Sequence, residues 1–178
     1  MRFDNRPFNN VTEMEEATVA LWNETVSEND TVYILGDFCW GGQQEWKRIL
    51  NKMKGHKVLI LGNHDAKRMG DARKCFDQIT PYLEINDGMY HLILCHYPIL
   101  AYNGSYRDNV FMLYGHVHVT DEQKMISTMV EKIQEQYDGV THLNRGQLIH
   151  VGCMMPWMNY IPRTIDYLVD KFDKKELW

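Results

Sequence analysis

The sequence predicts an α/β protein with mixed β-sheets, organised as a single domain over residues 1–178. Short apolar runs alternate with segments of helical periodicity, a pattern that favours parallel strands joined by helices. One pair of runs is separated only by Asn86-Asp87-Gly88, and an Asp-Gly pair predicts a tight antiparallel hairpin. With 178 residues, 44% of them hydrophobic, the chain is long enough for one substantial core.

Two helices are expected in the first third of the chain. Thr12 and Glu15 have the spacing of a capping box, which predicts a helix over residues 12–26. A second helix over residues 43–54 is expected to end at Gly55. It places four apolar side chains on one face, namely those of Trp46, Ile49, Leu50 and Met53.

The later helices are predicted in the same way. Residues 66–76 are weakly helical and basic, residues 121–137 are strongly helical, and Thr164 can cap a terminal helix that runs toward Phe172. The helix over 121–137 is expected to turn its apolar side chains inward, and these are Met125, Met129, Val130 and Ile133.

Four apolar runs end in side chains that can bind a metal ion. The runs are residues 31–37 (TVYILGD), 57–65 (KVLILGNHD), 91–96 (HLILCH) and 110–118 (VFMLYGHVH). Chemistry in open α/β sheets collects at the carboxyl ends of the strands. The candidate ligands at these ends are Asp37, Asn63, His96, His116 and His118.

The GHVH segment strengthens the metal interpretation. Residues two apart on a strand point the same way, so His116 and His118 are expected to converge while Val117 packs on the other face. A lone histidine is more often a packing or surface residue than a ligand. The combination of four such strand ends favours a metal site over coincidence.

The mixture of ligand types restricts the metal. Imidazole, carboxylate and amide oxygen without thiolate suit Mn, Fe, Zn or Co better than a structural zinc or a calcium site. Asp37 can bridge two ions. His64 can face the substrate and protonate the leaving oxygen, with Asp65 orienting it, or it can merely support the ligands.

Composition excludes several other classes of function. The net charge of −5 provides no basic footprint, so nucleic acid is not indicated as a partner. No apolar run approaches the roughly 20 residues that cross a bilayer, and the opening MRFDNRPF is not a signal peptide, so a cytoplasmic protein without a membrane partner is expected. Four unpaired cysteines predict reduced thiols, with Cys95 in the core.

The order of these motifs resembles the calcineurin-like metallophosphoesterase superfamily, and the Asn-Arg-Pro-Phe opening resembles its small bacterial and phage members. The resemblance implies a four-layer α/β/β/α sandwich with a dinuclear site that hydrolyses phosphomonoesters or phosphodiesters. It assigns Asp37 as the bridging ligand and His64 as the catalytic acid. It assigns Asn63, His96 and His116 to one metal and His118 to the other.

The chain departs from the family pattern at its beginning. The family starts with a strand that ends in Asp-x-His, whereas here Asp4 is followed by Asn5 and Arg6 without a preceding apolar run. The resemblance therefore implies a sandwich that lacks its first strand, with the second metal position reduced to Asp37 and His118. One or two ions are expected, and open strand edges favour association into a homo-oligomer.

The leading hypothesis is metal-dependent hydrolysis of a small-molecule or nucleotide phosphoester, with a phosphodiester favoured. The family resemblance implies metal-bound hydroxide as nucleophile and His64 as general acid. The alternative is a catalytically impaired single-metal or metal-free binding protein on the same scaffold. A nucleic-acid-processing protein is a third hypothesis. The basic strip that suggests it is better explained as a solvated helix face, and it consists of Lys67, Arg68, Arg73 and Lys74.

Aromatic residues are expected near the mouth of the site. Trp40, Tyr97 and Tyr102 can stack on a nucleoside or an aryl group, or they can be ordinary loop packing.

Overall fold

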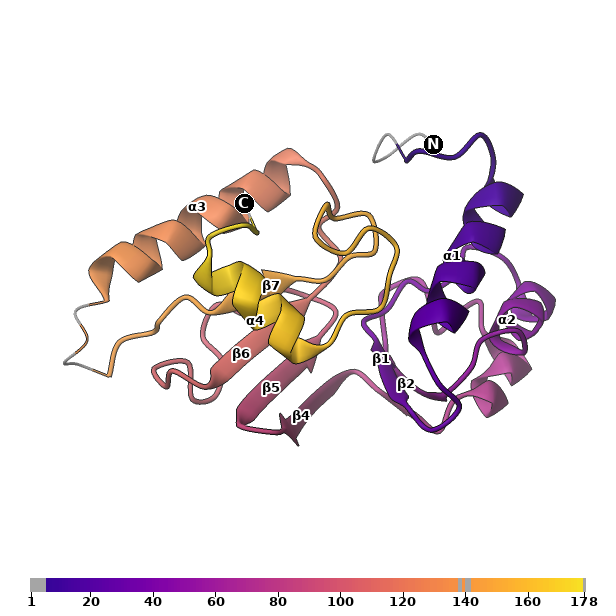
Figure 1. Cartoon of the computed structure of the whole chain (residues 1–178), viewed down its shortest axis with the longest axis horizontal. Helices are drawn as coiled ribbons and strands as arrows, with labels where there is room; N and C mark the ends of the chain where they lie inside the picture. The colour runs from indigo at the N-terminus through magenta and orange to yellow at the C-terminus, as the bar shows by residue number, and fades with distance from the viewer. Residues whose placement is uncertain (1–5, 138, 140–141, 178) are drawn as a thin grey trace.

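The computed structural model describes residues 6–137, 139 and 142–177 as a layered α/β protein with two β-sheets (Figure 1). The helices in this part of the chain are α1 (Val11–Thr25), α2 (Gln43–Leu50), the 3-10 helix η1 (Gly70–Cys75), α3 (Asp121–Gln136) and α4 (Ile165–Asp173). The strands are β1 (Thr31–Ile34), β2 (His56–Ile60), β3 (Gln78–Thr80), β4 (Tyr82–Asp87), β5 (Tyr90–Cys95), β6 (Val110–Tyr114) and β7 (Leu148–His150).

The two sheets differ in their strand directions. The first sheet has the order β1-β2-β3, and its pairs are parallel. The second has the order β4-β5-β6-β7, in which the β4–β5 hairpin is antiparallel and the other pairs are parallel. The mixed sheet expected from the hairpin is thus confirmed for the second sheet. The first is purely parallel in the described residues, because α2 and η1 connect its strands by crossovers.

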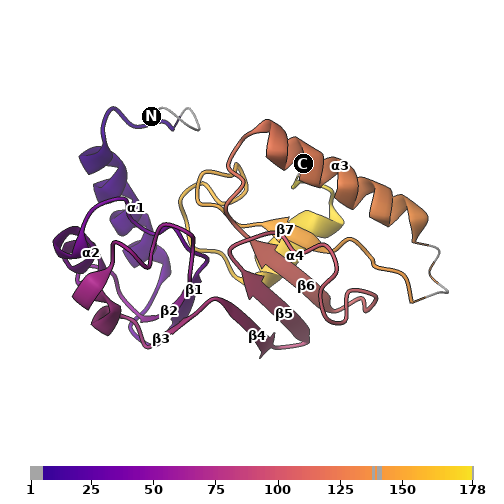
Figure 2. The ribbon, with the colours of Figure 1, turned by 180° about the vertical axis from the view of Figure 1, so that it is seen from behind.

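The first sheet is covered on both faces, as its alternating side chains require. Leu59 of β2 packs with side chains from α1 and α2, including Trp22 and Trp46. Val58 and Ile60 point to the opposite face, into a core shared with the second sheet. In two opposite views, α1 and α2 lie on the side of the first sheet that faces away from the second (Figure 1 and Figure 2).

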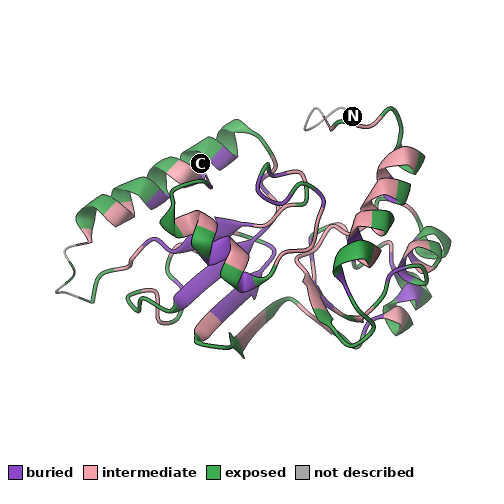
Figure 3. Ribbon diagram, in the orientation of Figure 1, coloured by how far each residue is buried: buried purple, intermediate pink, exposed green. Residues whose placement is uncertain are grey.

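The second sheet completes the layers. Leu92 and Leu94 of β5 face the shared core, to which α4 also contributes, whereas Ile93 faces α3. Strands β5 to β7 are mostly buried, while the edge strand β4 is only partly covered (Figure 3). The order of layers is therefore α1 and α2, first sheet, second sheet, α3. This arrangement confirms the expected α/β/β/α fold.

Helix α3 uses a different face from the predicted one. Its buried residues are Gln123, Ile126 and Val130, whereas Met125 and Met129 are exposed. The expectation that both methionines point inward was wrong. Positions 123, 126 and 130 follow the i, i+3, i+7 spacing that faces the sheet, and a glutamine stands at the first of them.

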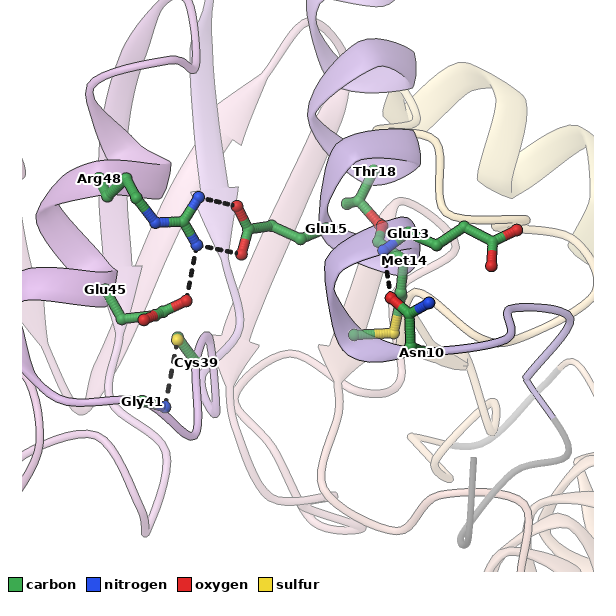
Figure 4. Close-up of polar contacts among 9 residues, drawn as sticks. All are labelled: Asn10, Glu13, Met14, Glu15, Thr18, Cys39, Gly41, Glu45 and Arg48. Atoms are coloured by element: carbon green, nitrogen blue, oxygen red, sulfur yellow. Dashed lines mark hydrogen bonds and ion pairs between the residues drawn. The ribbon is translucent and has the colours of Figure 1, made fainter.

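The N-cap of helix α1 lies two residues earlier than expected. The Asn10 side chain accepts a hydrogen bond from the Glu13 backbone N–H (Figure 4). The Glu13 carboxylate accepts two from Asn9. The cap is therefore Asn10 rather than Thr12. Glu15, the expected partner of Thr12, instead accepts two hydrogen bonds from Arg48 and so joins α1 to α2 (Figure 4).

Helix α2 fixes the loop that follows β1. Trp46 has 0% of its surface exposed, and its indole N–H donates to the backbone oxygen of Cys39 at 3.1 Å. Leu50 and Met53 are buried in the same core cluster as Trp46, as predicted, but the helix expected over residues 43–54 ends at Leu50, so Met53 lies beyond it. The loop over residues 38–42 is therefore anchored from inside by a core side chain.

Trp46→Ala is expected to lower the free energy of unfolding by about 3–5 kcal/mol, because it empties a fully buried site and leaves the Cys39 carbonyl without its donor. Urea unfolding followed by circular dichroism measures the loss. Trp40→Ala is the matched control: Trp40 is 59% exposed, so its truncation is expected to cost less than about 1 kcal/mol. Equal losses in the two variants would contradict the assignment of Trp46 to the core.

Candidate metal centre

Four strand ends meet at one edge of the two sheets. Asp37 follows β1 and Asn63 follows β2 in the first sheet, while His96 follows β5 and His116 follows β6 in the second. One ligand atom from each of Asp37, His96 and His116 lies within 4.8 Å of the other two. The structure thus brings together the residues that the sequence placed at strand ends.

The His96 imidazole is oriented by the first sheet. Its Nδ1 lies 2.8 Å from the backbone oxygen of Leu35, and a carbonyl can only accept, so Nδ1 carries the proton. In the neutral ring, Nε2 then presents a lone pair. This is the arrangement in which metal-binding histidines are held by a backbone carbonyl.

Several electron-pair donors face this lone pair. Nε2 of His96 lies 3.1 Å from Asn63 Oδ1, 3.6 Å from Asp37 Oδ2 and 3.2 Å from His116 Nδ1. The Asn63 and Asp37 oxygens and the neutral Nε2 all offer lone pairs, which repel one another unless a cation or a proton lies between them, whereas the tautomer of His116 decides whether its Nδ1 accepts or donates. The donor set therefore fits a divalent ion of the borderline type that accepts imidazole and oxygen ligands.

The pKa values of these groups reflect the same crowding. Burial opposes ionisation of Asp37, but hydrogen bonds from His96 and the His64 backbone outweigh it and lower its pKa. Burial also disfavours protonated His96, yet Asp37 and the Leu35 carbonyl raise its pKa overall. For His116, burial and the neighbouring His96 both lower the pKa.

The GHVH segment is a loop rather than the end of a strand. Strand β6 ends at Tyr114, and His116 and His118 adopt φ angles of +68° and +44°. Such angles are uncommon for residues other than glycine and mark a constrained turn. The expectation that the two histidines converge by strand alternation was therefore wrong, although Val117 is buried as predicted.

His118 lies outside the compact group. His116 belongs to it, whereas the partly buried His118 is not among the three side chains that converge. The backbone N–H of Val117 donates to the Gly115 oxygen, which turns the chain sharply between the two histidines. The two histidines are therefore arranged by a turn centred on His116, and not by strand alternation.

Asp65 plays a different part from the expected one. Its carboxylate is 0% exposed and accepts the backbone N–H groups of Asp37, Phe38 and Gly62, at 2.9, 3.1 and 2.8 Å. The hydrogen-bond partners of the Asp65 carboxylate are thus backbone groups that follow β1 and β2, not the His64 ring. Asp65 positions the loops that carry the ligands.

Two glycines permit this close approach. A Cβ on Gly62 would lie 2.3 Å from Asp37 Oδ1, and one on Gly36 would lie 2.5 Å from His96 Nδ1. Gly36 also has a φ of +84°, which other residues rarely adopt. The glycines of the GD and GNHD motifs are therefore required by the packing of the site.

His64 lies next to the ligand group. Its backbone N–H donates to Asp37 Oδ1 at 3.0 Å, and its ring lies 4.4 Å from the Trp40 ring, with an interplanar angle of 38°. The side chain is only partly buried, so a ligand can reach it.

Two other sequence candidates lie away from solvent. Tyr102 is buried, and its hydroxyl donates to the backbone oxygen of Gln147, so it is a core residue rather than part of the mouth. His150, the last residue of β7, is also buried and stacks on Tyr114 at 5.1 Å between ring centroids. Sequence reasoning missed the Leu35 carbonyl, because a backbone group leaves no signal in the residue types.

Asp65→Asn is expected to lower the free energy of unfolding by about 3 kcal/mol, because the amide cannot accept three N–H bonds as the carboxylate does. Asp71→Asn is the control, since this aspartate is exposed. Urea unfolding of both variants measures the difference. An Asp65 variant as stable as the Asp71 variant would contradict the positioning role.

Gly62→Ala is expected to weaken Mn²⁺ binding at least about tenfold, because the added methyl group displaces Asp37. Isothermal titration calorimetry measures the affinity. Gly42→Ala is the matched control, since a Cβ at Gly42 meets nothing within 4 Å. Unchanged affinity in the Gly62 variant would show that Asp37 does not need its present position.

Comparison with known proteins relates this chain to one protein family and to several of its relatives. The family model described as calcineurin-like phosphoesterase matches residues 13–170. The uncharacterized protein MJ1445 of Methanocaldococcus jannaschii is 29% identical over 178 residues, which cover 98% of this chain and 84% of that protein. The Gene 66 protein of Mycobacterium phage L5 is 26% identical over 182 residues, covering 78% of this chain and 86% of that protein.

A solved structure supports the fold. The protein of unknown function AQ665 from Aquifex aeolicus superposes with a TM-score of 0.61 and 23% identity, over 93% of this chain and 88% of that one. Within the described residues, no helix combines the length and the apolar character needed to cross a bilayer.

Proposed function

Since the chain belongs to the calcineurin-like phosphoesterase family, we propose that it hydrolyses a phosphodiester of a small molecule or nucleotide with the help of one or two divalent ions, Mn, Fe, Zn or Co. The proposal rests mainly on the convergence of lone pairs around His96 Nε2. The residues that would hold an ion there are Asp37, Asn63, His96 and His116, with His118 as a ligand of a second ion.

The protein residues prepare the site before a substrate arrives. A bound divalent ion would polarise a phosphoryl oxygen and lower the pKa of a water molecule. Asp37 supplies a carboxylate whose pKa is lowered by its neighbours, so it is charged and ready to bind a cation. Leu35 keeps His96 in the tautomer whose Nε2 can bind, and Asp65 holds the backbone on either side of Asp37.

His64 is the proposed general acid. Its backbone is tied to Asp37, so the residue is held beside the ligand group while its partly buried side chain remains accessible to a leaving oxygen. An imidazole titrates near neutral pH and can donate a proton to that oxygen as the P–O bond breaks. Asp65 contributes to this step through the backbone turn that carries His64 and not by contact with the ring.

Metal content and turnover test the proposal together. The purified chain is expected to bind at least one Mn²⁺ and to hydrolyse bis(p-nitrophenyl) phosphate only when the ion is present. Asp37→Asn is expected to reduce the rate at least about 100-fold, because it removes the ligand charge without changing the side-chain size. Asp71→Asn serves as control, and Mn-independent turnover, or turnover unaffected by Asp37→Asn, would refute the site assignment.

Leaving-group dependence tests His64 separately. His64→Gln is expected to slow hydrolysis of ethyl phenyl phosphate about 100-fold but that of ethyl p-nitrophenyl phosphate less than about tenfold. The reason is that p-nitrophenolate is a weaker base than phenolate, so it leaves with less help from a proton donor. The matched control is His56→Gln, which alters an exposed histidine paired with Asp77. Equal losses on the two esters would argue against His64 as the acid.

One observation favours the alternative of a single-metal binding protein. In the part of the chain that the structure describes, the compact group contains Asp37, His96 and His116 but not His118. Elemental analysis decides between the two proposals when it is combined with the turnover assay. One ion without turnover would identify a binding protein, whereas Mn-dependent turnover would identify an enzyme.

A further inference from the structure

Two large aromatic side chains beside the metal centre are exposed. Trp40 has 59% of its surface accessible and Tyr97 has 45%, whereas the nearby Tyr114 is fully buried. Leaving an aromatic ring in water forgoes the free energy of its burial, roughly 25 cal/mol per Å². Exposed rings that border a site are therefore candidates for ligand contact.

Trp40 is held in place despite its exposure. The Arg68 guanidinium donates to the Trp40 backbone oxygen at 2.5 Å and lies 4.9 Å from the centre of the indole ring. The Arg68 backbone N–H in turn donates to the backbone carbonyl oxygen of Asp65. Trp40 is thus tied to the turn that carries His64, and its ring is fixed against the His64 imidazole.

Tyr97 borders the site from the second sheet. Its ring lies 4.6 Å from the His116 ring and 5.2 Å from the His96 ring. Trp40 contacts His64, so the two exposed rings touch different histidines of the same centre. A ligand whose phosphate binds at the ligand group would therefore lie near two exposed aromatic rings, one beside His64 and the other beside His96 and His116.

We infer that the substrate is a nucleotide ester whose base stacks on Trp40, with Tyr97 bordering the site at His96 and His116. This inference rests on the proposed function, because it takes the ligand group as the position of the phosphate. A planar base gains stacking energy on an indole, and the Arg68 cation beside the same ring adds to the attraction for a π-system. An alkyl phosphoester would leave both rings in water. The net charge of −5 favours a short nucleotide over a long polynucleotide.

Binding of two phosphomonoesters tests the inference without any need for turnover. Isothermal titration of the Mn-loaded chain is expected to give an affinity for adenosine 5′-monophosphate at least about fivefold higher than for ethyl phosphate. This factor is the smallest gain in affinity expected from the stacking of one base on an aromatic side chain. Trp40→Leu is expected to bring the ratio of the two affinities within about twofold of one, whereas Trp40→Phe, which keeps a ring, retains most of the preference.

Control variants complete the design. Tyr106→Leu removes an exposed aromatic side chain that packs against His142 and Arg107, and it is expected to leave the ratio unchanged. Equal affinity for the two ligands, no binding of the nucleotide, or a preference that survives Trp40→Leu would each overturn the inference.

Turnover of bis(p-nitrophenyl) phosphate by the same preparations separates the two proposals. Mn-dependent turnover without nucleotide preference would support the proposed function and overturn this inference. Nucleotide preference that depends on Trp40, without turnover, would support this inference and overturn the proposed enzymatic function.

Discussion

The buried carboxylate of Asp65 is the interaction on which the metal centre depends. It accepts three backbone N–H groups, two from the loop after β1 and one from the loop after β2. Parallel strands release their chains at the same edge, and the N–H groups there have no partner in the sheet. One buried anion satisfies three of these donors and joins the loops that carry Asp37 and Asn63. The hydrogen bonds to an ionised acceptor also offset the cost of burying the charge.

A second constraint joins the two sheets at the same place. His96 follows β5 of the second sheet, and its Nδ1–H donates to the backbone oxygen of Leu35, which follows β1 of the first sheet. This bond fixes both the tautomer and the direction of the ring, so a contact between layers determines which nitrogen faces the ligand group. Gly36 and Gly62 allow the backbones to approach closely enough for these contacts. Fold stability and ligand geometry consequently share the same few residues.

The arrangement of the layers also determines which aromatic side chains near the site are buried and which are exposed. Trp46 lies inside the first helical layer and anchors the β1 loop, while Trp40, six residues earlier on the same segment, remains in solvent. A short loop with one buried anchor and one tethered aromatic ring provides a rigid border without closing the site. Trp40 and Tyr97 therefore both remain exposed beside histidines of the site.

The sequence by itself determined the strand ends, the residue types at those ends and the order of layers implied by the family motifs. Apolar runs that stop at Asp37, Asn63 and His96 can be recognised because the residue types indicate both which side chains are buried and which can bind a metal ion. The helix ends were harder to predict from the sequence. Asn10 and Thr12 are both good N-caps, and only the folded helix shows which of them is used.

Only the tertiary structure decided the direction in which side chains point. It turned the chain after Tyr114, so that His116 joins the ligand group and His118 does not. It also assigned Asp65 to backbone N–H groups instead of the His64 ring. The physical reason is common to both cases: positive φ angles and backbone hydrogen bonds arise when separate elements meet, and neither is encoded in the spacing of residues along one strand.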